Sequence, residues 1–257
     1  MVVNKYYEFK NITNDKAELY ISGEIQSECG IFDDPSECGD NVLTNFINTV
    51  QSLKNVKNLD IHVNSVGGDL FAGIQMYNCL KQLSNTNKTV YVDSLAASSA
   101  SLVSMAGDKI VMPSNAFLMM HKPMVGASGN ADDLRKTADM LDQLEDGMLT
   151  IYQENSCAGV TTEQIKNMVD NETWLNGVEA SKYFKNIELV SQINVLNTAN
   201  LNFENCSYKQ IPKILLVQNP KIEKINIGKA ENTENKVDIS EVDNALLEFE
   251  VLLELNK

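Results

Sequence analysis

The sequence predicts an α/β domain followed by a C-terminal tail of different composition. From about residue 17 to residue 190, short apolar runs alternate with segments of helical periodicity, which is typical of helices layered on a sheet. Beyond about residue 197 this alternation stops, and Asn, Lys and Glu dominate. We therefore expect one folded domain over residues 1–196 and an acidic Asn/Lys/Glu-rich extension over residues 197–257.

Strands are expected where short apolar runs are bounded by polar or turn-forming residues. Six runs meet this description, namely residues 17–22, 58–63, 89–93, 109–112, 116–120 and 187–190. In the extension, only residues 211–217 have the character of a strand.

Helices are expected where apolar residues recur every three or four positions. Six segments of the domain follow this pattern, namely residues 42–53, 72–83, 98–106, 131–152, 162–169 and 177–184. Asp132 and Asp133 stand in the first turn of the fourth segment, where negative charge interacts favourably with the helix dipole. A further amphipathic helix is expected between Ile239 and Leu253, at the end of the extension.

Charge and hydropathy exclude several classes of protein. The chain has 257 residues, with 21 Lys and Arg against 35 Asp and Glu, so its net charge is −14. We expect no nucleic-acid partner, because binding phosphate needs clustered Lys and Arg. No apolar run is long enough to span a membrane, and residues 1–10 lack the apolar core of a signal peptide. The expectation is a soluble cytoplasmic protein without a membrane partner.

The cysteines and histidines predict neither a disulfide framework nor a metal site. The five cysteines form no Cys-x-x-Cys pair, and only two histidines could add ligands.

A glycine-rich polar cluster, residues 63–69, follows the second predicted strand. Gly67 and Gly68 would expose backbone N–H groups there and let a ligand approach the main chain. Alternatively, the glycines serve only the geometry of a strand-to-helix turn. A phosphate-binding loop is not predicted, because no G-x-G-x-x-G pattern is present and no Lys follows.

A second polar cluster, residues 93–101, lies between a strand and an apolar helix. A serine at this turn, such as Ser98, would stand at a helix N-terminus, where partial positive charge favours a developing anion. The alternative is that Ser98 only caps the helix.

A nucleophilic serine needs a base, and the sequence offers His62 and His121. His62 lies inside a predicted strand and is expected to be structural. His121 ends the run 116–120 beside a turn, which suits a general base. A carboxylate that orients the imidazole could come from residues 170–174.

Four sequence blocks, in this order and spacing, resemble the ClpP family of serine peptidases. They are Asn64-Ser65-Val66-Gly67-Gly68, Ala96-Ala97-Ser98, Met120-His121-Lys122-Pro123, and Glu172-Thr173-Trp174-Leu175 with Glu179-Ala180. The resemblance covers about residues 15–192. Within the family, the sequence most resembles the ClpP-related head-maturation proteases of phages and prophages. It implies the ClpP/crotonase-like fold, a spiral of ββα units with helices outside, followed here by the C-terminal tail.

The resemblance also implies roles for individual residues. Ser98 matches the family's nucleophile and His121 its general base, 23 positions later. The backbone amides of Gly67, Gly68 and Ser99 match the oxyanion hole, which binds charge on the scissile carbonyl oxygen.

The triad acid stays open between two residues. Glu172 stands at the family's aspartate position when counted without gaps from Glu179 and is favoured, whereas Asp170 has the family's residue type two positions earlier. Val66 replaces the family's proline without removing an N–H that the mechanism needs. Ser94 replaces its glycine and adds a side chain near the nucleophile.

The implied activity is that of a serine endopeptidase that hydrolyses peptide bonds, with no metal or organic cofactor. The implied partners are protein or peptide substrates, capsid or scaffold proteins in the case of the phage relatives, and copies of the chain in a ring-forming homo-oligomer. Cellular ClpP also works with a Clp-type ATPase. The implied location is the cytoplasm of a bacterial host.

Two other functions stay open. A crotonase-type acyl-CoA hydratase or hydrolase would use the amides of Gly67 and Gly68 without needing Ser98 and His121 together. A catalytically silent capsid-assembly or scaffold protein would need none of these residues.

Overall fold

The computed structural model describes residues 6–27, 42–191, 201, 203, 206–213 and 215. The chain divides into two compact units, residues 1–219 and 220–257, and every described residue belongs to the first. Within the described ranges, no helix combines the length and apolar character needed to cross a membrane.

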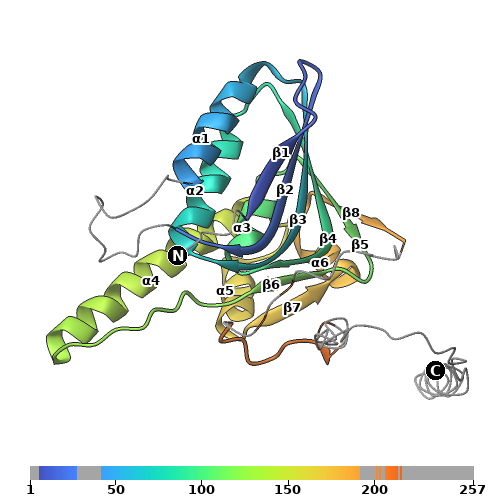
Figure 1. Cartoon of the computed structure of the whole chain (residues 1–257). Coiled ribbons are helices and arrows are strands. Elements are labelled where there is room, and N and C mark those ends of the chain that lie inside the picture. The colour runs from blue at the N-terminus through green and yellow to red at the C-terminus, as the bar shows by residue number, and fades with distance from the viewer. Residues whose placement is uncertain are drawn as a thin grey trace, which may run out of the picture. The chain divides into compact units, whose positions relative to one another are not determined.

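A single eight-stranded sheet forms the centre of this unit (Figure 1). Its strands are β1 (Tyr7–Lys10), β2 (Lys16–Ile25), β3 (Asn58–Gly68), β4 (Asn87–Ala97), β5 (Lys109–Pro113), β6 (Phe117–Met120), β7 (Thr173–Asn176) and β8 (Ile187–Val190). The strand order is β1-β2-β3-β4-β5-β8, and neighbours from β2 to β8 are parallel.

The strand β4 changes neighbour along its length. Its first half pairs with β5 through residues 89–91, and its second half pairs with β6 through residues 95–97. β6 in turn pairs antiparallel with β7. The carboxyl ends of β4 and β6 therefore lie side by side, and residues that follow these two strands meet at one edge.

The helices cover the sheet and extend beyond it. They are α1 (Val42–Ser52), α2 (Leu70–Lys81), α3 (Ser99–Ser104), α4 (Ala131–Glu154), α5 (Thr162–Asp170) and α6 (Gly177–Tyr183), with a 3-10 turn η1 (Leu53–Asn55) after α1. Figure 1 shows α1 and α2 side by side along one face of the sheet, whereas α4 projects away from it. The helix α4 starts with a capping box, in which Asn130 and Asp133 bond each other's backbone N–H groups.

Alternating side chains of the parallel strands build the core. In β3, Leu59, Ile61 and Val63 are fully buried under the helices. The opposite face carries His62, which stacks between Tyr20 and Tyr91 at ring distances of 4.7 and 4.9 Å. His62 thus packs in a ladder across three strands, and its Nδ1 atom lies 3.1 Å from the Asp93 carboxylate.

The predicted α/β fold class is confirmed, and the structure differs from the prediction at the carboxyl ends of β3 and β4. β3 and β4 run on to Gly68 and Ala97, so both polar clusters lie partly inside strands. The helix expected over residues 98–106 is shorter and begins at Ser99, because Ser98 has a positive φ that a helix excludes.

Three other expectations differ from the structure or lie outside it. β1 and β7 are not expected from the sequence, because only two of the four residues in each strand are apolar and neither forms an apolar run. The prediction of a strand over residues 211–217 is wrong for the residues that the structure describes there. Lys213 and Leu215 are helical after Pro212, whose fixed φ suits a first helical turn. The helix expected between Ile239 and Leu253 lies outside the described residues.

Candidate active site

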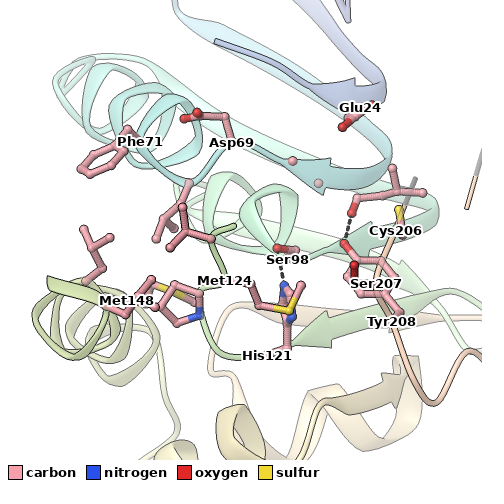
Figure 2. Close-up of a pocket in the computed structure, with 18 of the residues that line it drawn as sticks. Glu24, Asp69, Phe71, Ser98, His121, Met124, Met148, Cys206, Ser207 and Tyr208 are labelled. Carbon is pink, nitrogen blue, oxygen red and sulfur yellow. Dashed lines mark hydrogen bonds between the residues drawn. The ribbon is translucent and has the colours of Figure 1, made fainter. Parts of the chain in front are cut away.

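Ser98 lies in a strained turn between β4 and α3. It has φ 51° and ψ −126°. Non-glycine residues rarely adopt positive φ, and such outliers cost about 1–3 kcal/mol and cluster at functional sites. Hydrogen bonds hold the turn, because Ser98 N–H donates to Met119 O at 2.9 Å and Ser101 Oγ donates to Ser98 O at 2.6 Å. The turn presents the Ser98 side chain to a pocket (Figure 2).

Two glycines at the end of β3 let its backbone pass close to this turn. Gly67 has φ 83°, and a Cβ there would lie 2.4 Å from Ala97 O and 2.8 Å from Ser98 Cβ. Gly68 has φ 144°, and a Cβ there would lie 2.0 Å from Ile25 O. Neither position accepts a larger residue without movement of the main chain, so the glycine pair is needed for this packing.

The three amides expected in an oxyanion hole differ in their partners. Gly67 N–H donates to Ser65 Oγ at 3.0 Å. Gly68 is in register with Ile25 of β2 and borders the pocket beside Ser98. Ser99 is the first residue of α3, where an N–H has no acceptor inside the helix. Gly68 borders the pocket and Ser99 follows Ser98 directly, so their amides are the candidates to bind an oxyanion.

His121 follows β6 directly and meets the serine turn across the strand pair. Ala97 is in register with Met119, so the residues after β4 and β6 lie together at the sheet edge. The Nε2 atom of His121 lies 2.7 Å from Ser98 Oγ. Burial lowers the pKa of His121 below its ordinary value, and the charge of Glu172 opposes this shift. A neutral imidazole in hydrogen-bond contact with a hydroxyl can act as its general base.

Glu172 lies near His121 but is hydrogen bonded elsewhere. Its carboxylate accepts from Lys209 N–H at 2.7 and 3.0 Å, from Gln210 N–H at 2.7 Å and from Trp174 Nε1–H at 3.3 Å. No hydrogen bond joins Glu172 to His121 among the described residues. The two groups interact only through charge in this arrangement.

Asp170, the alternative acid, is held in ion pairs. Its carboxylate lies 2.8 Å from Lys122 Nζ and 3.1 Å from Lys166 Nζ. The hydrogen bond from Lys122 is the main reason that the pKa of Asp170 lies below its usual range. Of the two acids considered, only Glu172 acts electrostatically on His121.

A pocket of about 390 Å³ opens beside Ser98 and His121 (Figure 2). One wall is apolar and comes from the start of α2, the loop after His121 and α4, with Phe71, Met124, Leu144 and Met148 among its residues. The exposed fractions of Phe71 and Met124, 47% and 55%, are large for apolar side chains. Such a wall suits an apolar side chain of a ligand.

The opposite wall contains residues of the extension that sequence reasoning missed. Cys206, Ser207 and Tyr208 line the same pocket. The Tyr208 hydroxyl donates to Val66 O, and its ring lies edge-on to the His121 ring at 5.2 Å. The available signal was an aromatic residue inside an otherwise polar segment, which alone does not indicate a site.

In the part of the chain that the structure describes, no group of three or more His, Cys, Asp or Glu side chains could hold a metal ion.

Comparison with known proteins assigns this fold and motif order to a family. Residues 20–187 match the Clp protease family. The ATP-dependent Clp protease proteolytic subunit of Bacteroides fragilis is 32% identical over 130 residues, which cover 49% of this chain and 61% of that relative. Proteolytic subunit 1 of Streptomyces coelicolor is 28% identical over 129 residues, which cover 49% of this chain and 58% of that relative. The chain spans about three fifths of the length of these curated relatives.

Among solved structures, a ClpP1 mutant from Listeria monocytogenes has a TM-score of 0.53 with this chain. The likeness covers 66% of this chain and 90% of that one at 20% sequence identity, so it concerns the fold. It confirms the ClpP-like fold class. Because the family match runs from β2 to the start of β8, the chain belongs to the Clp protease family.

Proposed function

We propose that this protein is a serine endopeptidase that hydrolyses peptide bonds through Ser98, His121 and Glu172. The observation that carries the proposal is the 2.7 Å contact between Ser98 Oγ and His121 Nε2. The strained Ser98 turn and the positions of Gly68 at the pocket and Ser99 directly after Ser98 support the same chemistry. An acyl-CoA hydratase or a silent scaffold protein would not need this contact.

In the proposed mechanism, Ser98 Oγ attacks the scissile carbonyl carbon while His121 Nε2 takes the hydroxyl proton. The amides of Gly68 and Ser99 bind the resulting oxyanion. Collapse of the tetrahedral intermediate breaks the C–N bond, and His121 returns the proton to the leaving amine. A water molecule, activated by His121, then releases the acyl group from Ser98. Glu172 would stabilise the imidazolium by accepting from Nδ1–H.

The substrate class and partners follow from the family relationship. Relatives named as proteolytic subunits of an ATP-dependent protease support protein or peptide substrates, and a Clp-type ATPase partner. Membership of this family supports a ring-forming homo-oligomer. The motif resemblance to phage head-maturation proteases supports capsid or scaffold proteins as substrates, in the cytoplasm of a bacterial host.

A fluorophosphonate probe tests the nucleophile. We expect the probe to label the wild-type chain and to leave Ser98→Ala unlabelled. Ser94→Ala is the matched control, because Ser94 is a buried serine of β4, the strand that ends directly before Ser98, and takes no part in the proposed chemistry; this variant should keep its label. Labelling that persists in Ser98→Ala would contradict the assignment. Absence of labelling in the assembled wild type would favour the hydratase or scaffold function.

A further inference from the structure

The described residues between 201 and 215, here called the tail segment, pack against the active site although they lie outside the family match. Leu201 and Leu215 are only 3% and 4% exposed. They belong to a small apolar cluster, separate from the main core, with Val66, Leu95, Ala97 and Met119. Ala97 precedes the nucleophile directly, and Met119 accepts the hydrogen bond from Ser98 N–H. The tail segment is therefore anchored on the strand ends that carry the catalytic pair.

Tyr208 of the tail segment occupies space next to that pair (Figure 2). Its hydroxyl donates to Val66 O, beside the glycine pair of β3. Its ring lies edge-on to His121 at 5.2 Å and to Trp174 at 5.8 Å. Burial raises the pKa of Tyr208, so the hydroxyl stays protonated as a donor. A polypeptide substrate that extends from Ser98 toward this wall has to displace the Tyr208 side chain.

The tail segment also engages the favoured acid of the triad. The backbone N–H groups of Lys209 and Gln210 both donate to the Glu172 carboxylate, and the Gln210 side chain donates to Asn171 O. A working triad needs this carboxylate to accept from His121 Nδ1–H. In the arrangement described here, the backbone of the tail segment takes the place of that imidazole N–H.

We propose that the tail segment is an intramolecular cover that holds the peptidase site in a latent state. It blocks one side of Ser98 with Tyr208 and holds Glu172 away from His121 through the amides of Lys209 and Gln210. Release of the segment frees the carboxylate to pair with His121 and opens that wall to substrate. The inference rests on the proposed peptidase function and concerns the regulation of the same site.

Full-length point variants test the cover. Lys209→Pro removes a backbone donor to Glu172, and Lys209→Ala is the matched control that keeps this donor. Tyr208→Ala removes the blocking ring independently. Trp174 is the only tryptophan of the chain and contacts both Tyr208 and Glu172, so its fluorescence reports release of the tail segment whether or not the enzyme is active. A thermal melt of each variant confirms that the domain stays folded.

We expect Lys209→Pro and Tyr208→Ala to shift the Trp174 emission to longer wavelength and to speed fluorophosphonate labelling of Ser98 about tenfold, as expected when one or two hydrogen bonds that favour a closed state are lost. Lys209→Ala should match the wild type in both measurements.

Several outcomes would overturn the cover. Unchanged emission in both variants would mean that these contacts do not hold the segment. If the emission shifts but labelling is unchanged or slower, the tail segment is a fixed wall of the site and not a cover. In that case, labelling of the wild type would still support the peptidase proposal. Shifted emission with no labelling of any variant or of the wild type would overturn the peptidase proposal together with the cover.

Discussion

Lys122 Nζ lies 2.8 Å from a carboxylate oxygen of Asp170, so an ion pair joins the residue after His121 to the last residue of α5. Lys122 and Lys166 also pair with Glu145, a buried carboxylate of α4. Asp170 therefore belongs to a charge cluster that ties the loop after β6 to two helices. This cluster holds the loop that follows His121, and because it engages Asp170, it supports the proposed choice of Glu172 as the acid.

The two candidate acids should respond differently to removal of charge. We expect Glu172→Gln to lower kcat of peptide hydrolysis by about a hundredfold or more, because an amide cannot stabilise the imidazolium. Asp170→Asn should lower it less than about threefold, since exposed ion pairs contribute little. Steady-state kinetics on a fluorogenic peptide measures both values. Equal, small effects would show that neither carboxylate is the acid.

The glycine pair of β3 provides a test of the packing behind Ser98. Gly67→Ala should destabilise the domain by about 2 kcal/mol or more and slow fluorophosphonate labelling, because the new Cβ would enter the space of Ala97 O at a positive φ. Gly147→Ala is the control, since it lies in α4 with open space around it and should stabilise the domain by about 0.5–1 kcal/mol. Chemical denaturation measures both. If Gly67→Ala left the free energy of unfolding unchanged, the close approach of the β3 backbone to the Ser98 turn would not be required.

The apolar wall of the pocket predicts a preference for substrates with an apolar side chain next to the scissile bond. Leu144→Asp places a charge on this wall and should lower kcat/KM for such peptides about tenfold or more, mainly through KM. Leu134→Asp adds the same charge to the same helix at an exposed position that does not line the pocket, so its kinetics should equal those of the wild type. An equal loss of kcat/KM in both variants would mean that the charge acts by disturbing α4 and not by changing the pocket wall.

Much of the fold could be predicted from the sequence, because apolar periodicity reports burial directly. Residues 58–63 alternate Leu59, Ile61 and Val63 toward the core, and this pattern predicts β3. The strand's continuation to Gly68 could not be predicted in this way, since polar and glycine residues there pair with β2 without any apolar signal.

The order of the sequence motifs could predict that Ser98 pairs with His121, but it could not predict the hydrogen bonds of the Glu172 carboxylate. The contact follows from the register of β4 with β6, which the four blocks preserve. Glu172 acts on His121 by charge, but its hydrogen bonds come from Lys209 and Gln210, about forty residues away in a segment without periodicity. Long-range backbone contacts of this kind leave no pattern in the local sequence.

The environment of His121 predicts the acidic limb of the pH–activity profile. Only the neutral imidazole can take the Ser98 proton, so kcat/KM should rise as pH increases through the pKa of His121. Burial holds this pKa below the ordinary value of 6.5, and we expect the midpoint of the limb below that pH. Glu172→Gln removes the charge that opposes this shift, so its midpoint should move lower still. Asp170→Asn should leave the midpoint unchanged, because Asp170 is not among the groups that shift His121. A wild-type midpoint above 6.5 would mean that Glu172 outweighs burial, as expected for an imidazole already paired with its acid.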